Sequence, residues 1–170
     1  VLRGLNVRLP ADIRVLSVEE AAPGFHARFH ATGKAYRYRV VTTPILMPFD
    51  RHGAWHVPWR LDVEAMRDAA ARFVGTHDFA SFQARGTRIT DTVRTLSRVD
   101  LTPGSGTLTL DVEGDGFLRH MVRTMAGTLV EIGSGQRRPE DVDAMFTARS
   151  RDAAGKTAPA QGLTLVRVSY

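Results

Sequence analysis

The alternation of apolar and polar residues along the chain predicts five strands. The pattern is clearest at residues 34–42, where Tyr36, Tyr38 and Val40 share one face and the intervening residues share the other. Two further alternating stretches meet at "PGSG" (103–106), which is typical of a tight turn and predicts an antiparallel hairpin. The predicted strands cover residues 13–19, 34–42, 92–103, 106–116 and 163–170.

A spacing of three or four residues between apolar positions predicts helices between these strands. One helix begins after the capping residue Asp62 and ends at Gly75, and a short one runs from Pro139 to about Ala148. The stretch "GDGFLRHMVRTMAGTLVEIG" (114–133) predicts a longer helix, and the first residues of the chain have the pattern of the end of another. This mixture of hairpins and helices predicts an α+β fold, a mostly antiparallel sheet with helices packed on one face.

The predicted helix at 114–133 carries three basic residues near its N-terminus, where the helix dipole is already positive. Of Arg119, His120 and Arg123, the last lies at the edge of the apolar face, so its charge needs an anionic partner. Two interpretations stay open from the residues alone. Arg123 extends to water or pairs with a nearby acid, or it serves a functional anion from elsewhere. The acids just upstream are Asp111, Glu113 and Asp115.

Composition favours a polyanionic partner. The net charge is +5 and the isoelectric point about 10.4. Lys34 and Lys156 are the only lysines, so arginine supplies nearly all of the positive charge. Arginine binds phosphate through two parallel hydrogen bonds and stacks on bases, which favours RNA. A basic α+β domain with a protein partner is the alternative that charge leaves open.

The sequence gives no support to several other classes of protein. It contains no cysteine, which excludes a disulfide framework and a thiolate metal site. No apolar run approaches the roughly 20 residues that span a bilayer, so we expect no membrane partner and a cytoplasmic protein. The pairs His26/His30 and His52/His56 have a spacing of four, but they lie outside the predicted helices and have no third ligand nearby. We therefore expect no metal site.

Five sequence blocks, in order along the chain, resemble one known family. They are "FHARFHATGKAYRYRV", "GTHDFASFQARG", "DTVRTL", "GDGFLRHMVRTMAGTLVEIGSG" and "TAPAQGLTLVRVSY". The match runs from about Leu5 to Tyr170 and closely resembles the tRNA pseudouridine synthase A family. The resemblance implies the α+β fold of the pseudouridine synthase catalytic domain. It also implies an isomerase that converts uridine to pseudouridine at positions 38, 39 and 40 of the tRNA anticodon stem-loop, with tRNA as partner, a homodimer and no cofactor.

The resemblance also implies roles for individual residues. Tyr36 corresponds to the tyrosine that stacks on the target base, and Leu118 to an apolar residue beside that base. Arg123 corresponds to the arginine that pairs with the catalytic aspartate. His26 and Arg28 belong to a block expected near the RNA. Arg119 and His120 are expected to face RNA phosphate.

The family's catalytic aspartate lies in a motif of the form R-T-D-A-G-V-H, and this sequence contains no such motif. We therefore expect residues 1–170 to be the C-terminal portion of a pseudouridine synthase domain, with the nucleophilic aspartate outside this chain and the chain inactive alone. The alternative is a non-catalytic basic RNA-binding module derived from the same family. In either case we expect Arg123 to be unpaired, or paired with a stand-in such as water, sulfate or a misplaced carboxylate.

Overall fold

The computed structural model describes residues 1–170, which form two compact units, residues 1–30 and residues 31–170. The first unit contains a single short helix, α1 (Leu2–Arg8), followed by chain without regular secondary structure. Two hydrogen bonds of 2.8 Å join the side-chain amide of Asn6 to the backbone of Val15 and tie the following segment back to the helix. The helix expected at the start of the chain is therefore confirmed.

The strand predicted at residues 13–19 is wrong. These residues form no ladder, and Ile13, Leu16 and Val18 are all exposed. A strand is stable only when a neighbour takes its backbone hydrogen bonds and another layer covers its apolar face. Residues 1–30 form no strand in the structure, so the alternating residues at 13–19 have no partner strand within this unit.

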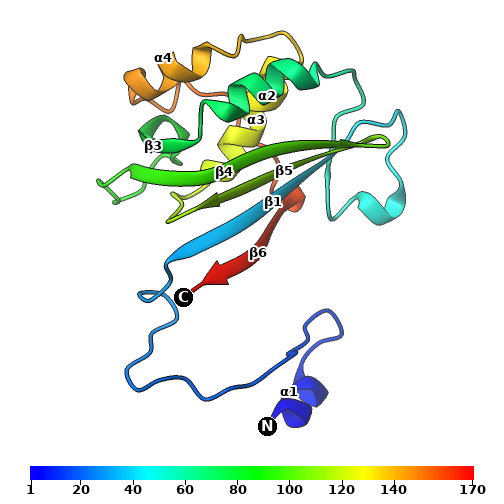
Figure 1. Ribbon diagram of the computed structural model, residues 1–170. Helices are drawn as coiled ribbons and strands as arrows, with labels where there is room; N and C mark the ends of the chain where they lie inside the picture. Colours follow the sequence, from blue (N-terminus) through cyan, green and yellow to red (C-terminus); the bar gives the residue numbers. More distant parts are fainter. The chain divides into compact units, whose positions relative to one another are not determined.

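The second unit is built on a six-stranded sheet (Figure 1). The central strand β1 pairs with β5 on one side and with both β6 and β2 on the other, and the sheet continues through β4 to β3. All pairings are antiparallel except β1 with β2, as expected for hairpin-rich sequence. The strands are β1 (Gly33–Val41), β2 (Trp55–His56), β3 (Gly75–Asp78), β4 (Val93–Gly104), β5 (Thr107–Gly114) and β6 (Leu163–Ser169).

Three helices cover one face of this sheet, α2 (Val63–Ala71), α3 (Met121–Gly133) and α4 (Asp141–Ala148) (Figure 1). Asp62 caps α2 as predicted, because its carboxylate accepts a hydrogen bond of 3.0 Å from the amide of Ala65. The α+β fold with helices on one face is confirmed. No helix in the structure is long and apolar enough to span a bilayer.

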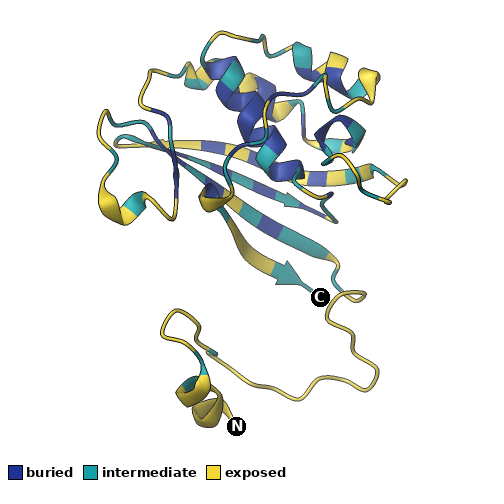
Figure 2. Ribbon diagram, turned by 180° about the vertical axis from the view of Figure 1, so that it is seen from behind, coloured by how far each residue is buried: buried dark blue, intermediate teal, exposed yellow.

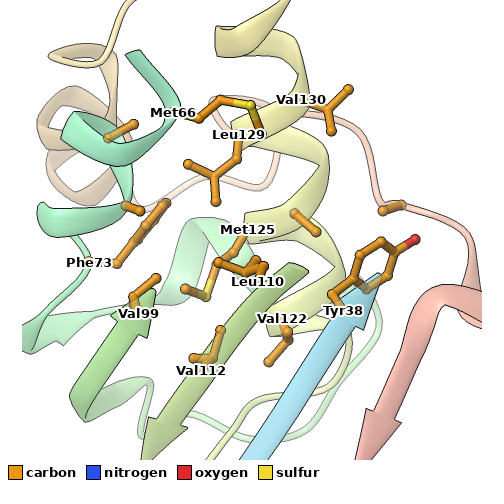
Figure 3. Close-up of a cluster of buried hydrophobic side chains, with 14 of the residues drawn as sticks. Tyr38, Met66, Phe73, Val99, Leu110, Val112, Val122, Met125, Leu129 and Val130 are labelled. Carbon is orange, nitrogen blue, oxygen red and sulfur yellow. The ribbon is translucent and has the colours of Figure 1, made fainter. Parts of the chain in front are cut away.

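The core lies between the sheet and α3, which is buried along most of its length (Figure 2). Figure 3 shows Met125 and Leu129 of α3 above Leu110 and Val112 of β5. The spacing of apolar residues in 114–133 predicts one apolar face, and the structure confirms it: Val122, Met125, Leu129 and Ile132 of α3 are each at most 3% exposed. Leu118, on the same predicted face, is also 3% exposed but precedes the helix.

The predicted start of this helix is wrong, because α3 begins at Met121 rather than near Gly114. Gly114 is the last residue of β5, and Asp115 extends the sheet through two hydrogen bonds of 3.1 Å with the backbone of Thr95. His120 then has a φ of +63°, a left-handed conformation that does not occur within a right-handed α-helix, so the helix begins only after it. Arg119 and His120 therefore lie in a turn before the helix, and only Arg123 lies in its first turn.

Candidate functional site

Arg123 is held at the start of α3 by the loop that precedes β6. Its Nε donates a hydrogen bond of 2.7 Å to the carbonyl oxygen of Ala158, and the amide of Ala158 donates one of 3.0 Å to the carbonyl oxygen of Arg123. The side chain forms no ion pair, and neither terminal nitrogen of the guanidinium has a hydrogen-bond partner. The site thus presents a fixed, partly buried cation with two donor groups free to bind an anion.

The acids just upstream of α3 do not pair with Arg123. Asp111 forms a two-point ion pair with Arg37, at 2.8 and 3.1 Å. Glu113 pairs with Arg98 and Arg167. The side-chain carboxylate of Asp115 accepts its hydrogen bond from the backbone of Thr95. The interpretation of Arg123 as one half of a local ion pair is therefore excluded in this structure, and its partner there is a backbone carbonyl.

Two glycines let the loop at 151–159 approach α3 closely enough to reach Arg123. A Cβ at Gly127 would overlap the carbonyl oxygen of Lys156, and a Cβ at Gly155 would lie 2.7 Å from the Cα of Thr128. The amide of Gly155 also donates a hydrogen bond of 3.0 Å to the Thr128 hydroxyl. The loop therefore lies directly on the helix backbone, which fixes the Ala158 carbonyl beside Arg123.

The two tyrosines of β1 have different surroundings. Tyr38 is fully buried, and its hydroxyl donates a hydrogen bond of 2.7 Å to the carbonyl oxygen of Pro159, the neighbour of Ala158. Burial raises the pKa of Tyr38, and the charge of Arg123 partly opposes this. Tyr36 is only partly buried, and its ring packs edge-on against Phe117 at 5.0 Å. Tyr38 is therefore a structural residue, whereas Tyr36 keeps an accessible side chain.

The segment before α3 places Leu118, Arg119 and His120 in succession. Leu118 is 3% exposed and belongs to the hydrophobic core of this chain. The Arg119 carbonyl accepts a hydrogen bond of 2.9 Å from the amide of Ala84, while its side chain is exposed and has no partner. Burial and the charges of Arg123, Arg119 and Arg151 lower the pKa of His120. The segment thus turns a cationic side toward solvent and an apolar side toward the core.

Arg119 and His120 line a pocket of about 490 Å³. Its opposite walls come from the segment after the short 3-10 helix at Ala80–Phe82 and from the loop at 151–157. The sequence analysis did not predict the basic residues on those walls, because neither segment has the periodic pattern of a helix or a strand. Only one of them, Arg85, lies in a sequence block that resembles the family. These missed residues are Arg85, Arg151 and Lys156.

His26 and Arg28 belong to the first unit, so the structure does not place them relative to Arg123. Both are exposed. The ring of His26 lies 4.3 Å from that of Phe29 and accepts hydrogen bonds from the amides of Arg28 and Phe29. The Arg28 guanidinium lies 5.6 Å from the centre of the Phe29 ring. The structure contains no group of three or more side chains suited to holding a metal ion.

Comparison with known proteins places this arrangement in a family. Residues 69–170 match the family profile described as "tRNA pseudouridine synthase". The chain is 49% identical to tRNA pseudouridine synthase A of Bacillus pumilus over 166 residues, which cover 98% of this chain and 67% of that protein. The enzymes of the same name from Syntrophotalea carbinolica and Bacillus subtilis are 47% and 48% identical, with 66% and 67% of their lengths covered.

The chain therefore spans about two thirds of the length of these relatives. The matched profile covers more than half of the chain, and it includes the whole of α3, Arg123 and the loop that holds it. The resemblance on which the site residues were first identified is thus confirmed at the level of the family. We conclude that this chain belongs to the tRNA pseudouridine synthase family.

Proposed function

We propose that this chain is the C-terminal portion of a tRNA pseudouridine synthase that acts on uridines 38, 39 and 40 of the anticodon stem-loop. The observation that carries the proposal is Arg123, a partly buried guanidinium fixed through Nε and free at both terminal nitrogens. In this family the corresponding arginine pairs with the catalytic aspartate. The relatives named above as tRNA pseudouridine synthase A support the substrate class.

The proposed reaction is an isomerisation that needs no cofactor. The bond between N1 of uracil and C1′ of ribose breaks, the base rotates, and a bond forms between C5 and C1′. The proton on C5 leaves and N1 gains one, so the composition of the nucleotide is unchanged. The target nucleotide must leave the base stack, because its glycosidic bond is inaccessible in a paired stem.

In this proposal Arg123 orients the nucleophilic aspartate and keeps it ionised. A guanidinium beside a carboxylate favours its charged form and binds both of its oxygens. The aspartate itself comes from outside residues 1–170. Two observations support this: the family's aspartate motif does not occur in the sequence, and no carboxylate of this chain pairs with Arg123.

Tyr36 is proposed to stack on the target base and to assist removal of the C5 proton. Its position on β1, partly exposed and braced by Phe117, suits a ring that must present a flat face at a fixed angle. The resemblance also assigns Leu118 a place beside the same base, whereas in this chain its side chain is 3% exposed and packs in the core. His26 and Arg28 are proposed to contact the RNA. We also propose that the protein is a homodimer in the cytoplasm. This part of the proposal is supported by the resemblance to the family.

A non-catalytic RNA-binding module is the second candidate. The specific observation in its favour is that the chain keeps a cationic pocket beside Arg123 while its sequence lacks the aspartate motif. In this candidate Arg123 binds a phosphate rather than a carboxylate. The two candidates differ in one measurable property, the loss of the C5 proton from a uridine in tRNA.

Release of tritium from tRNA labelled at C5 of uridine separates the candidates. The 170-residue chain and the protein translated from the complete reading frame that contains it are assayed side by side. We expect release with the longer protein and none with the chain alone. Release by the chain alone would overturn the claim that the aspartate comes from elsewhere. A longer protein that binds tRNA but releases no tritium would support the RNA-binding module.

A further inference from the structure

The walls of the pocket of about 490 Å³ beside α3 carry more cationic than anionic side chains. Four cationic residues line it, together with His120 and a single carboxylate, that of Asp152. Asp152 is already engaged, because it pairs with Arg85. The four cationic residues are Arg85, Arg119, Arg151 and Lys156.

This excess is unusual within the same unit. Most arginines of residues 31–170 form ion pairs with aspartate or glutamate, including Arg37, Arg72 and Arg149. Arg119 and Arg151, which face the pocket, form none, and neither does Arg123 nearby. Placing like charges together costs free energy unless an anion joins them. An anionic ligand would therefore stabilise this group of unpaired cations.

The walls of the pocket are held by hydrogen bonds that do not neutralise its positive charges. Arg151 donates hydrogen bonds to the carbonyl oxygen of Ala154 and, at 2.9 Å, to the Thr157 hydroxyl. Glu131 accepts a hydrogen bond of 2.9 Å from the amide of Lys156 and so anchors the loop to α3. Burial, together with the charges of Arg85 and Arg137, lowers the pKa of Arg151, and the carboxylates of Asp152 and Glu131 only partly oppose this.

We propose that this pocket is a phosphate-binding subsite that holds the backbone of the RNA strand next to the reacting uridine, with Arg119 and Arg151 as its principal ligands. This inference rests on the proposed function, because it takes tRNA as the substrate. Guanidinium groups bind phosphate oxygens through two parallel hydrogen bonds, and the start of α3 adds the positive end of a helix dipole at the same wall.

The backbone conformation at the pocket supports the same conclusion. His120 forms part of the wall with a φ of +63°, a strained conformation for a residue with a side chain. Such strain concentrates at ligand sites, where geometry takes precedence over stability. The left-handed turn is also what directs the preceding residue, Arg119, out of the helix and into the pocket wall.

The proposal is tested by the salt dependence of RNA binding to the 170-residue chain. Fluorescence anisotropy is measured with a labelled anticodon stem-loop RNA between about 50 and 200 mM salt. Each phosphate contact contributes roughly one unit to the slope of log K against log salt. We expect Arg119→Ala and Arg151→Gln each to weaken binding about tenfold and to reduce the slope by roughly one. Arg60→Ala, which removes an exposed arginine without an ion pair, is the matched control and should change neither quantity.

The outcomes separate this proposal from the proposed function. Wild-type slopes in both variants, or no RNA binding by the chain, would overturn the phosphate subsite. Arg119 has no side-chain partner to lose, so Arg119→Ala keeps the test valid if Arg151→Gln unfolds. Inorganic phosphate is measured in parallel, and binding of phosphate with no preference for RNA would assign the pocket to a free anion instead. If the slopes fall as expected while the longer protein releases no tritium, the subsite stands and the proposed reaction fails.

Discussion

Arg123 and Ala158, 35 residues apart in the sequence, hold each other through two hydrogen bonds. The side chain of Arg123 donates to the Ala158 carbonyl, and the Ala158 amide donates to the Arg123 carbonyl. The first bond fixes the direction of the guanidinium, and the second fixes the loop against α3. The position of the candidate active-site cation therefore depends on how closely the loop can approach the helix.

Replacing Gly127 by alanine tests that dependence. The new Cβ would meet the Lys156 carbonyl oxygen, so the loop backbone must move away from α3. Overpacking of this kind costs about 1–3 kcal/mol. We expect Gly127→Ala to lower the free energy of unfolding by about that amount in urea denaturation. Gly53→Ala is the control, because nothing lies within 4 Å of a Cβ there. Equal effects of the two substitutions would show that the loop is not held by the glycine.

The left-handed conformation of His120 predicts that a glycine is more stable than an alanine at this position. A side chain in this conformation costs about 1–2 kcal/mol, whereas glycine adopts it freely. We expect His120→Gly to be more stable than His120→Ala by about 1 kcal/mol, since both lose the imidazole and only glycine relieves the strain. Thermal or urea denaturation of the pair measures this. If the alanine variant is as stable as the glycine variant, the conformation is not strained.

The carboxylate of Asp78 stabilises the folded chain when it is ionised, and we expect this stabilisation to be lost in acid. Burial opposes ionisation of Asp78, but hydrogen bonds from Thr92 and Ala80 and the Arg149 guanidinium at 2.5 Å together lower its pKa below the ordinary 3.8. A lowered pKa in the folded state means that the unfolded chain binds the proton more readily. The stabilisation is therefore complete well above pH 3.8 and disappears as the pH falls through the lower, folded value.

We expect Asp78→Asn to be less stable than the wild type by about 1–3 kcal/mol at pH 7, with the difference shrinking as the pH falls below about 4. Urea denaturation at several pH values measures it. Asp100→Asn, which alters an exposed ion pair with Arg98, is the comparison and should cost less than about 1 kcal/mol. A difference at Asp78 that stays constant down to pH 2 would contradict the lowered pKa.

The sequence predicts those parts of this fold whose pattern is local. The alternation in β1, the turn between β4 and β5, and the apolar stripe of α3 all arise from residues that are neighbours in the chain. The strand predicted at 13–19 was wrong because alternation does not reveal whether a partner strand exists. The start of α3 was wrong because Asp115 is held by Thr95 of β4, a contact that periodicity cannot show.

In the candidate site, too, some features follow from the local sequence pattern and others depend on contacts between distant parts of the chain. Arg123 stands out in the sequence because a charge at the edge of an apolar stripe needs a partner. Its bond to Ala158 and the approach of Arg151 and Lys156 depend on the path of a loop that has no periodic pattern. The roles of Tyr36 and Leu118 came only from the resemblance to the family, since residues of these types in a sheet and beside a helix are most often core residues.

The most direct test of this account is the rate of pseudouridine formation by the Arg123→Ala variant of the complete protein, measured as tritium release from tRNA under single-turnover conditions. The account predicts that the rate falls by more than about a hundredfold, because an uncompensated catalytic aspartate loses both orientation and charge stabilisation. It also predicts that Arg60→Ala keeps the wild-type rate and that both variants unfold cooperatively. A folded Arg123→Ala variant that forms pseudouridine at the wild-type rate would contradict it.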